Sequence, residues 1–123
     1  MTQIEATHKP VIAIGTIGGT ISMTAAKPGE GVKSTLGAEQ LVNSIPGLDR
    51  VDVELRLHSI ANMASGSIRF KDLFKLLGWA NQQIEQGANG VVIVQGTDTL
   101  EETAFFLDLY WSHQAPLVLT GAM

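Results

Sequence analysis

Apolar residues gather in three short, unbroken runs along the chain. The runs are Val11–Ile14, Val91–Val94 and Leu117–Leu119. Unbroken apolar runs of this length are typical of strands that are buried on both faces of a parallel sheet. Over residues 51–58, apolar side chains instead alternate with charged or polar ones. That alternation predicts a strand with one face in water, which suits the edge of the sheet.

Two helices are predicted between these strands. Apolar residues recur at helical spacing over residues 70–84, and Gly87 is placed to end this helix as a left-handed C-terminal cap. Thr99 and Glu102 have the spacing of a capping box, so a second helix is expected to begin there. The apolar face of this second helix comprises Leu100, Ala104, Leu107 and Trp111. Both helices are expected to cover a sheet.

The remaining segments complete an alternating order of strands and helices. Residues 16–36 are rich in glycine and are expected to form a long loop, and a short helix is expected over residues 38–44, before Pro46. The resulting order predicts an α/β fold, a three-layer, doubly wound parallel sheet with right-handed crossovers. The sequence ends directly after the fourth strand, so we expect residues 1–123 to be one partial domain, truncated before the next crossover.

The composition narrows the classes of function. Eight Lys and Arg against twelve Asp and Glu give a net charge of -4, and no basic cluster is available to neutralise the phosphates of a nucleic acid. The absence of cysteine excludes a disulfide framework, a thiolate metal site and a cysteine nucleophile. No apolar run approaches the roughly 18 residues of a membrane span, and residues 1–10 lack the apolar core of a secretory signal. We therefore expect a cytoplasmic protein without nucleic-acid or membrane partners.

Two hydroxyl-rich segments, Gly15–Ile21 and Gln95–Thr99, follow predicted parallel strands. Ligands bind beyond the carboxyl ends of such strands, where helix N-termini and loops converge. Turn formation alone explains either segment equally well, because glycine permits positive φ and Thr or Asp caps helices. Phosphate binding is disfavoured: a dinucleotide fingerprint that starts at Gly15 needs glycine where Ile17 and Thr20 stand, and no lysine completes a Walker loop.

The residues of both segments carry a family resemblance. Gly18–Ser22 resembles the first signature of the bacterial-type L-asparaginase/glutaminase family, and Gln95–Ala104 is similar to its second. Leu119–Met123 is similar to a later segment, so the resemblance runs from about Val11 to the end of the chain but covers only the early part of a family member. It implies the α/β N-terminal domain of that family and hydrolysis of asparagine, or of glutamine, to the acid and ammonia. In that family a threonine forms an acyl-enzyme, and neither a metal nor an organic cofactor is needed.

The resemblance also implies roles for individual residues. Thr97 corresponds to the second catalytic threonine, and Asp98 to the carboxylate that binds the α-ammonium group of the substrate, a role that suits a position beside a helix N-terminus. Ser65 falls where the family places a serine that holds the substrate's carboxylate. Its alternative role is a helix cap, which Ser67 fills at least as well.

The sequence departs from the family at two positions. Ile17 stands where the family has its nucleophilic threonine. We expect Thr20, within the matched signature, to take over the attack, with Thr16 as the reserve and a mechanism based on Thr97 alone as a third alternative. Gln95 replaces a histidine of the family, and we expect this exchange to change the polarity of the site.

The chain offers no evident base for a threonine nucleophile. No lysine or arginine follows Lys75, and the family's lysine partner of the second threonine lies downstream of this chain's end. His58, on the wet face of a strand, and His113, at a helix C-terminus, are poor substitutes. We expect this chain alone to be an incomplete enzyme that forms homo-oligomers through its unpaired last strand. The alternative is a non-catalytic remnant that binds an amino acid or another chain.

Overall fold

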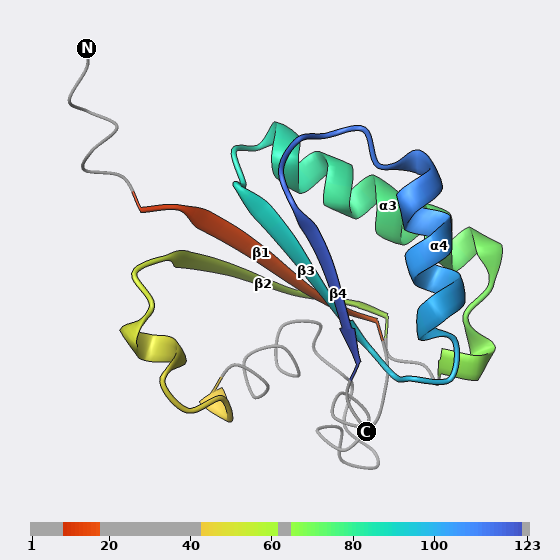
Figure 1. Ribbon diagram of the computed structural model, residues 1–123, viewed down its shortest axis with the longest axis horizontal. Coiled ribbons are helices and arrows are strands. Elements are labelled where there is room, and N and C mark those ends of the chain that lie inside the picture. Colours follow the sequence, from red (N-terminus) through yellow and green to blue (C-terminus); the bar gives the residue numbers. More distant parts are fainter. Residues whose placement is uncertain (1–8, 18–42, 62–64, 122–123) are drawn as a thin grey trace.

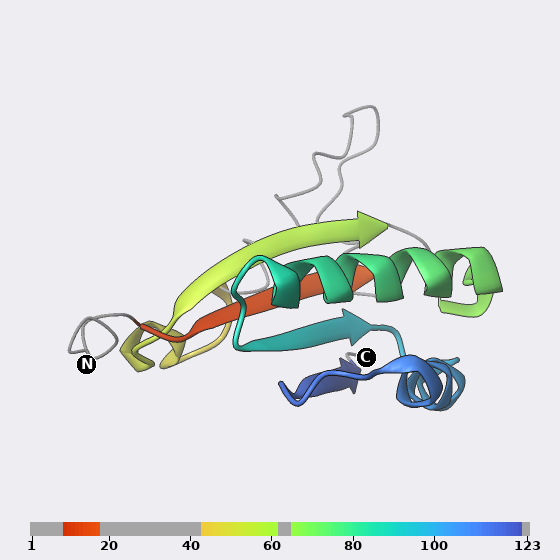
Figure 2. The same cartoon turned by 90° about the horizontal axis from the view of Figure 1, so that it is seen from above.

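The computed structural model describes residues 9–17, 43–61 and 65–121, which form a parallel four-stranded sheet with two α-helices on one of its faces (Figures 1 and 2). The strands are β1 (Val11–Ile17), β2 (Glu54–Ala61), β3 (Gly90–Gln95) and β4 (Leu117–Gly121). The helices are α3 (Phe70–Glu85) and α4 (Leu100–Tyr110), and two short 3-10 helices are η2 (Leu48–Arg50) and η3 (Ser65–Ser67). No helix in this part of the chain is long and apolar enough to cross a membrane.

The strand order is β2-β1-β3-β4, and all three neighbouring pairs are parallel. The chain therefore begins at a central strand, moves outward to β2, crosses back over β1 to β3 and continues to β4 (Figure 1). The direction of winding reverses between β1 and β3, which is the topological switch point of a doubly wound sheet. The predicted α/β fold and the edge position of β2 are confirmed. Residues 18–36 of the loop expected over residues 16–36, and most of the short helix expected over residues 38–44, lie outside the described residues.

Strand β1 is longer than the apolar run predicted. It continues through Gly15 and Thr16 to Ile17, so the loop does not begin at Thr16. Gly15 does not end the strand; it lets the side chains of Ile60 and Trp79 lie close to the backbone of β1. A Cβ atom at this position would lie 2.7 Å from Ile60 Cδ1 and 2.7 Å from Trp79 Cζ3. A glycine within a strand often marks such a contact.

Strand β2 does not leave its polar face in water, contrary to the prediction. The His58 ring stacks on the Trp79 indole of α3, with ring centroids 5.7 Å apart, and Arg56 donates a hydrogen bond to the carbonyl of Gln86. The polar face of β2 therefore packs against α3 and the residue that follows it. Leu55 and Leu57 lie on the opposite face of the sheet, where they pack in a second, smaller apolar cluster.

Helix α3 begins and ends near its predicted limits but buries a different face. The buried residues are Leu73, Leu76, Leu77 and Ala80. Phe70 and Phe74 belong to the predicted apolar stripe, yet they are 72% and 52% exposed. The N-cap is Arg69, whose backbone N–H donates to the Asp72 carboxylate, so the expected cap at Ser67 is wrong. Gly87 has φ 101, as predicted for a glycine that ends a helix.

Helix α4 follows Thr99, as predicted, but the expected capping box is wrong because the Thr99 side chain makes no cap hydrogen bond. The buried residues of α4 are Thr103, Phe106 and Leu107. Most of the predicted apolar face lines an open groove of about 300 Å³ between α4 and β4. The groove is lined by Ala104, Leu107, Asp108, Trp111, Leu117 and Leu119.

The main core lies between the sheet and the two helices. Its strand residues alternate with those that point to the other face: Ala13 and Ile17 of β1 and Val91 and Ile93 of β3 point toward the helices. Because Ile17 is the last residue of β1, this core extends to the carboxyl end of the sheet, where the candidate site lies.

Candidate functional site

The candidate site lies at the switch point, at the carboxyl ends of β1 and β3. The segment that follows β1 contains Thr20 and lies outside the described residues. The segment that follows β3 is the turn Gly96–Thr99, which connects directly to α4. Ligands of doubly wound sheets bind where two such segments meet.

Gln95 holds the turn after β3. It is the last residue of the strand, is fully buried and lies on the helix side of the sheet. Its Nε2 atom donates to the carbonyl of Gly96 at 3.2 Å and to Thr99 Oγ1 at 3.4 Å. The Gln95 side-chain amide therefore contacts the residue before and the residue after the Thr97–Asp98 pair. The Gln95 Oε1 atom is buried without a hydrogen-bond partner among the described residues.

Thr97 and Asp98 are both exposed at the tip of this turn. The turn closes through a 3.4 Å hydrogen bond from the Leu100 N–H to the Thr97 carbonyl, and α4 begins at Leu100. The free N–H groups of a helix N-terminus carry partial positive charge, and Asp98 lies two residues before Leu100, where α4 begins. The turn thus presents a hydroxyl and a carboxylate side by side to solvent.

The end of β4 approaches the same turn. A Cβ atom on Gly121 would lie 2.8 Å from Thr97 Cγ2 and 3.3 Å from Leu100 Cδ2. Only glycine lets the strand pass this close without displacing Thr97. The turn is therefore held from β3 by Gln95, and the Thr97 side chain lies directly against Gly121 of β4.

The two residues at the end of β1 have structural contacts. Ile17 is fully buried in the main core, so the side chain at the position of the family's nucleophile packs against the helices. Thr16 lies on the opposite face, is also fully buried, and donates from Oγ1 to Ser59 Oγ at 3.0 Å. The register of β1 with β2 shifts between these residues, which leaves an irregularity in the pairing opposite Ile60. Bulges of this kind are common beside active sites because they re-aim side chains.

The other predicted site residues are placed as follows. Ser65 begins η3, which follows β2 and precedes α3. His58 lies within β2 and stacks on Trp79, and His113 lies before β4, at the opposite end of the sheet from Thr97, where its Nε2 is 2.8 Å from Asn81 Oδ1. The structure thus brings together Thr97 and Asp98 and keeps His113 away from them.

Sequence reasoning missed the role of Gln95 as the residue that holds the turn. From the sequence, Gln95 was expected only to change the polarity of the site. A polar residue at the end of an apolar strand is nevertheless a signal for a local hydrogen bond. A cavity of about 500 Å³ adjoins the turn at Thr99, between the starts of α3 and α4. Its charged lining residues are Arg69 and Glu102. Within residues 9–17, 43–61 and 65–121, no group of three His, Asp or Glu side chains is arranged to hold a metal ion.

Comparison with known proteins identifies relatives over almost the whole chain. Residues 11–123 match the family described as "Asparaginase, N-terminal". The chain is 36% identical over 121 residues to a glutaminase-asparaginase of Acinetobacter glutaminasificans, a match that covers 91% of this chain and 35% of the relative. It is 33% identical over 118 residues to L-asparaginase 2 of Bacillus subtilis, covering 93% of this chain and 31% of the relative.

A solved structure shares the fold. The probable cytoplasmic L-asparaginase of Campylobacter jejuni superposes with a TM-score of 0.73 at 34% identity, over 93% of this chain and 33% of that protein. The chain therefore spans about a third of the length of the proteins it matches.

Proposed function

The chain belongs to the asparaginase family, and from this premise we propose that it supplies the substrate-binding turn of an amidohydrolase that acts on L-asparagine or L-glutamine. The observation that carries the proposal is the position of Thr97 and Asp98. They are exposed together at the switch point of the sheet, on a turn fixed from two sides. The names of the relatives support the class of substrate.

The proposed reaction has two steps. A threonine hydroxyl attacks the carbon of the side-chain amide, the C–N bond breaks, and the hydroxyl proton leaves with ammonia. Water then attacks the resulting ester and releases the carboxylic acid, which restores the hydroxyl. A hydroxyl is a weak nucleophile at neutral pH, so each step needs a base and donors for the oxyanion.

We assign the attack to Thr20 by its place in the family signature. The structure supports this choice over Thr16, because the Thr16 hydroxyl is buried and hydrogen-bonded to Ser59. Thr97 serves as the second threonine, which hydrogen-bonds the reacting amide. Asp98 binds the α-ammonium group and Ser65 the α-carboxylate, so that the side-chain amide points toward the end of β1.

We further propose that the base comes from outside these 123 residues and that the working enzyme is an oligomer in the cytoplasm. The length of the relatives, about three times that of this chain, supports the first point. The cytoplasmic designation of the Campylobacter jejuni protein supports the location. No cofactor is part of this mechanism.

One observation favours a second function. Ile17 occupies the nucleophile position with a fully buried apolar side chain. If neither Thr20 nor Thr97 attacks the amide, the site binds an amino acid without hydrolysing it. The two functions differ in one result, which is ammonia release.

A chimera tests the proposal. Residues 11–123 replace the matching third of the Campylobacter jejuni enzyme, and ammonia release is measured with L-asparagine and L-glutamine. We expect the chimera to be active and Thr97→Ala to lose most of the activity, while Thr97→Ser retains more of it. Thr120→Ala, which truncates an exposed threonine of β4, is the matched control. A chimera that binds L-asparagine but releases no ammonia would favour the second function.

A further inference from the structure

One polar side chain is buried at the end of a strand that is otherwise apolar. Gln95 is fully buried and directly follows the apolar run Val91–Val94 of β3. Its Oε1 atom has no hydrogen-bond partner among the described residues. A buried acceptor without a partner destabilises a fold, and natural sequences tolerate such conflicts mainly at functional sites. Stability alone therefore does not explain an amide at this position.

The nitrogen of the same amide makes two hydrogen bonds. Gln95 Nε2 carries two N–H groups and donates to the Gly96 carbonyl at 3.2 Å and to Thr99 Oγ1 at 3.4 Å. The two acceptors flank the Thr97–Asp98 pair. A neutral histidine, the residue of the family at this position, has a single N–H donor and can bind only one of these acceptors unless it is protonated. Glutamine bridges both acceptors while it remains uncharged.

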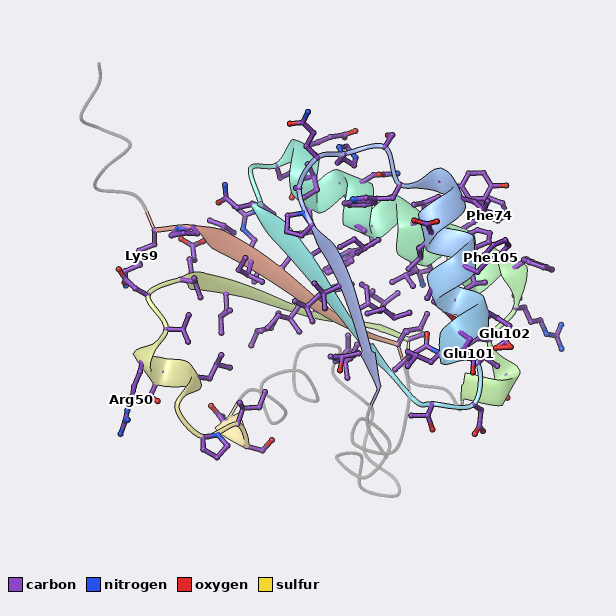
Figure 3. The ribbon with its side chains drawn as sticks, in the orientation of Figure 1. Lys9, Arg50, Phe74, Glu101, Glu102 and Phe105 are labelled. Atoms are coloured by element: carbon purple, nitrogen blue, oxygen red, sulfur yellow. The ribbon has the colours of Figure 1, made fainter. Side chains whose placement is uncertain are left out.

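The start of α4 is acidic, which makes an uncharged side chain at position 95 important. Glu101 and Glu102 occupy the first turn of the helix, and Figure 3 shows both at the end of α4 that follows the turn from β3. A protonated imidazole at position 95 would attract the Asp98 carboxylate and compete with an ammonium group of the substrate. The Gln95 amide holds the turn without this competition, so the carboxylate remains available to a cation.

The hydrogen bonds of Gln95 matter more for Asp98 than for Thr97. The Thr97 side chain has a second support, because its Cγ2 atom lies directly against Gly121 of β4. The exposed Asp98 side chain makes no hydrogen bond or ion pair with another described residue. Its position therefore depends on the backbone of the turn, which Gln95 holds on both sides.

We propose that Gln95 is a positioning residue for recognition of the amino acid: the two N–H groups of its Nε2 atom hold the turn so that Asp98 meets the α-ammonium group of the substrate. Because Gln95 is fully buried, it acts through the turn and not by touching the substrate. The inference rests on the proposed function for the ammonium group, but the hydrogen bonds can be tested without a substrate.

Hydrogen exchange of the 123-residue chain, followed by NMR, tests the hydrogen bonds in the absence of any reaction. Gln95→Met keeps the length of the side chain but removes both donors and the unpaired Oε1 atom. We expect Tm to change by less than about 3 °C, because losing an unsatisfied acceptor offsets the loss of two hydrogen bonds. The Leu100 N–H, which closes the turn on the Thr97 carbonyl, should exchange about tenfold faster, whereas the Gly87 N–H at the end of α3 should not change. Equal exchange at Leu100 in both chains would refute the role of Gln95 in the turn.

Kinetics of the chimera described above test the link to recognition. Gln95→Met should raise KM for L-asparagine about tenfold and lower kcat by less than about threefold, because Thr97 keeps its contact with Gly121 whereas Asp98 loses its support. A fall in kcat with an unchanged KM would overturn the proposal. If the wild-type chimera binds L-asparagine but releases no ammonia, hydrolysis is refuted, and the Kd for L-asparagine takes the place of KM and should rise by the same factor.

Two threonine variants of the chimera separate the hydrogen bond from general packing. Thr99→Val removes one acceptor of Gln95 and should also raise KM, but it should add little in the Gln95→Met background, where the donor is already absent. Thr103→Val is the matched control, since it removes the hydroxyl of another buried residue of α4, and it should leave KM unchanged. Fully additive effects of Gln95→Met and Thr99→Val, or an equal rise of KM in Thr103→Val, would overturn the proposal.

Discussion

Replacing Gly15 by alanine should weaken the packing of α3 on the sheet. The new Cβ atom would lie 2.7 Å from Ile60 Cδ1 and 2.7 and 2.8 Å from Cζ3 and Cη2 of Trp79. The Ile60 methyl is at the end of a flexible chain and can rotate away. The indole is rigid and is stacked against His58, so the strand or the helix must move.

The cost of Gly15→Ala follows from two opposing terms. Overpacking of this kind costs about 1–3 kcal/mol. Alanine also lowers the entropy of the unfolded chain, which returns about 0.4–1 kcal/mol. We expect a net loss of about 1–2 kcal/mol in the free energy of unfolding, or a Tm lower by about 3–10 °C for a chain of this length. Urea unfolding followed by circular dichroism, at one fixed protein concentration, measures the difference.

A double-mutant cycle with Trp79→Phe tests the cause. Phenylalanine lacks the outer ring of the indole, so two of the three short contacts disappear. In that background Gly15→Ala should be close to neutral, which gives a coupling energy of about 1–2 kcal/mol. Gly78→Ala is the control, since no atom lies within 4 Å of its missing Cβ, and it should stabilise the helix by about 0.5–1 kcal/mol. If Gly15→Ala costs the same stability in the wild-type chain and in the Trp79→Phe background, the steric explanation is refuted.

Three other predictions concern the site. With a reactive amide analogue, mass spectrometry of the chimera should locate the acyl adduct on Thr20, so that Thr20→Ala abolishes it and Thr16→Ala does not; an adduct on Thr16, or none, contradicts the assignment. Gly121→Ala should push Thr97 from its place and lower kcat/KM about 10- to 100-fold with little change in Tm, and unchanged kinetics would show that the close approach is not needed. The 123-residue chain alone should release no ammonia from L-asparagine, and turnover by the purified chain would mean that its site is complete.

The sheet could be predicted from the sequence because three of its strands contain unbroken apolar runs and the fourth alternates apolar with polar residues, and both patterns are typical of strands. Which face of each helix is buried could not be predicted. Helix α3 carries apolar side chains around much of its circumference, so the pattern does not distinguish the buried Leu73 and Leu77 from the exposed Phe70 and Phe74. The buried face of α3 depends on its contact with β1. Because Gly15 has no side chain, Trp79 of α3 packs directly against the strand, and this contact sets the orientation of the helix on the sheet.

The candidate site was predictable in part for the same reason. A hydroxyl and a carboxylate directly after a buried strand locate Thr97 and Asp98 at the carboxyl edge of the sheet. The hydrogen bonds of Gln95 and the approach of Gly121 depend on distances between segments, which no local pattern contains. The burial of Ile17 likewise follows from the length of β1, which the sequence underestimates because Gly15 resembles the end of a strand.

The most direct test of the proposed site compares two substrates that differ only in the group that Asp98 is proposed to bind. Succinamic acid has the side-chain amide of L-asparagine but no α-ammonium group. In the chimera, Asp98→Asn should lower kcat/KM for L-asparagine about 10- to 100-fold, because a hydrogen bond to a charged group is worth about 1.5–3 kcal/mol. The value for succinamic acid should change by less than about threefold, so the preference for L-asparagine collapses. Equal losses for both substrates, or no loss for either, would contradict the assignment of the turn after β3 as the site that recognises the amino acid.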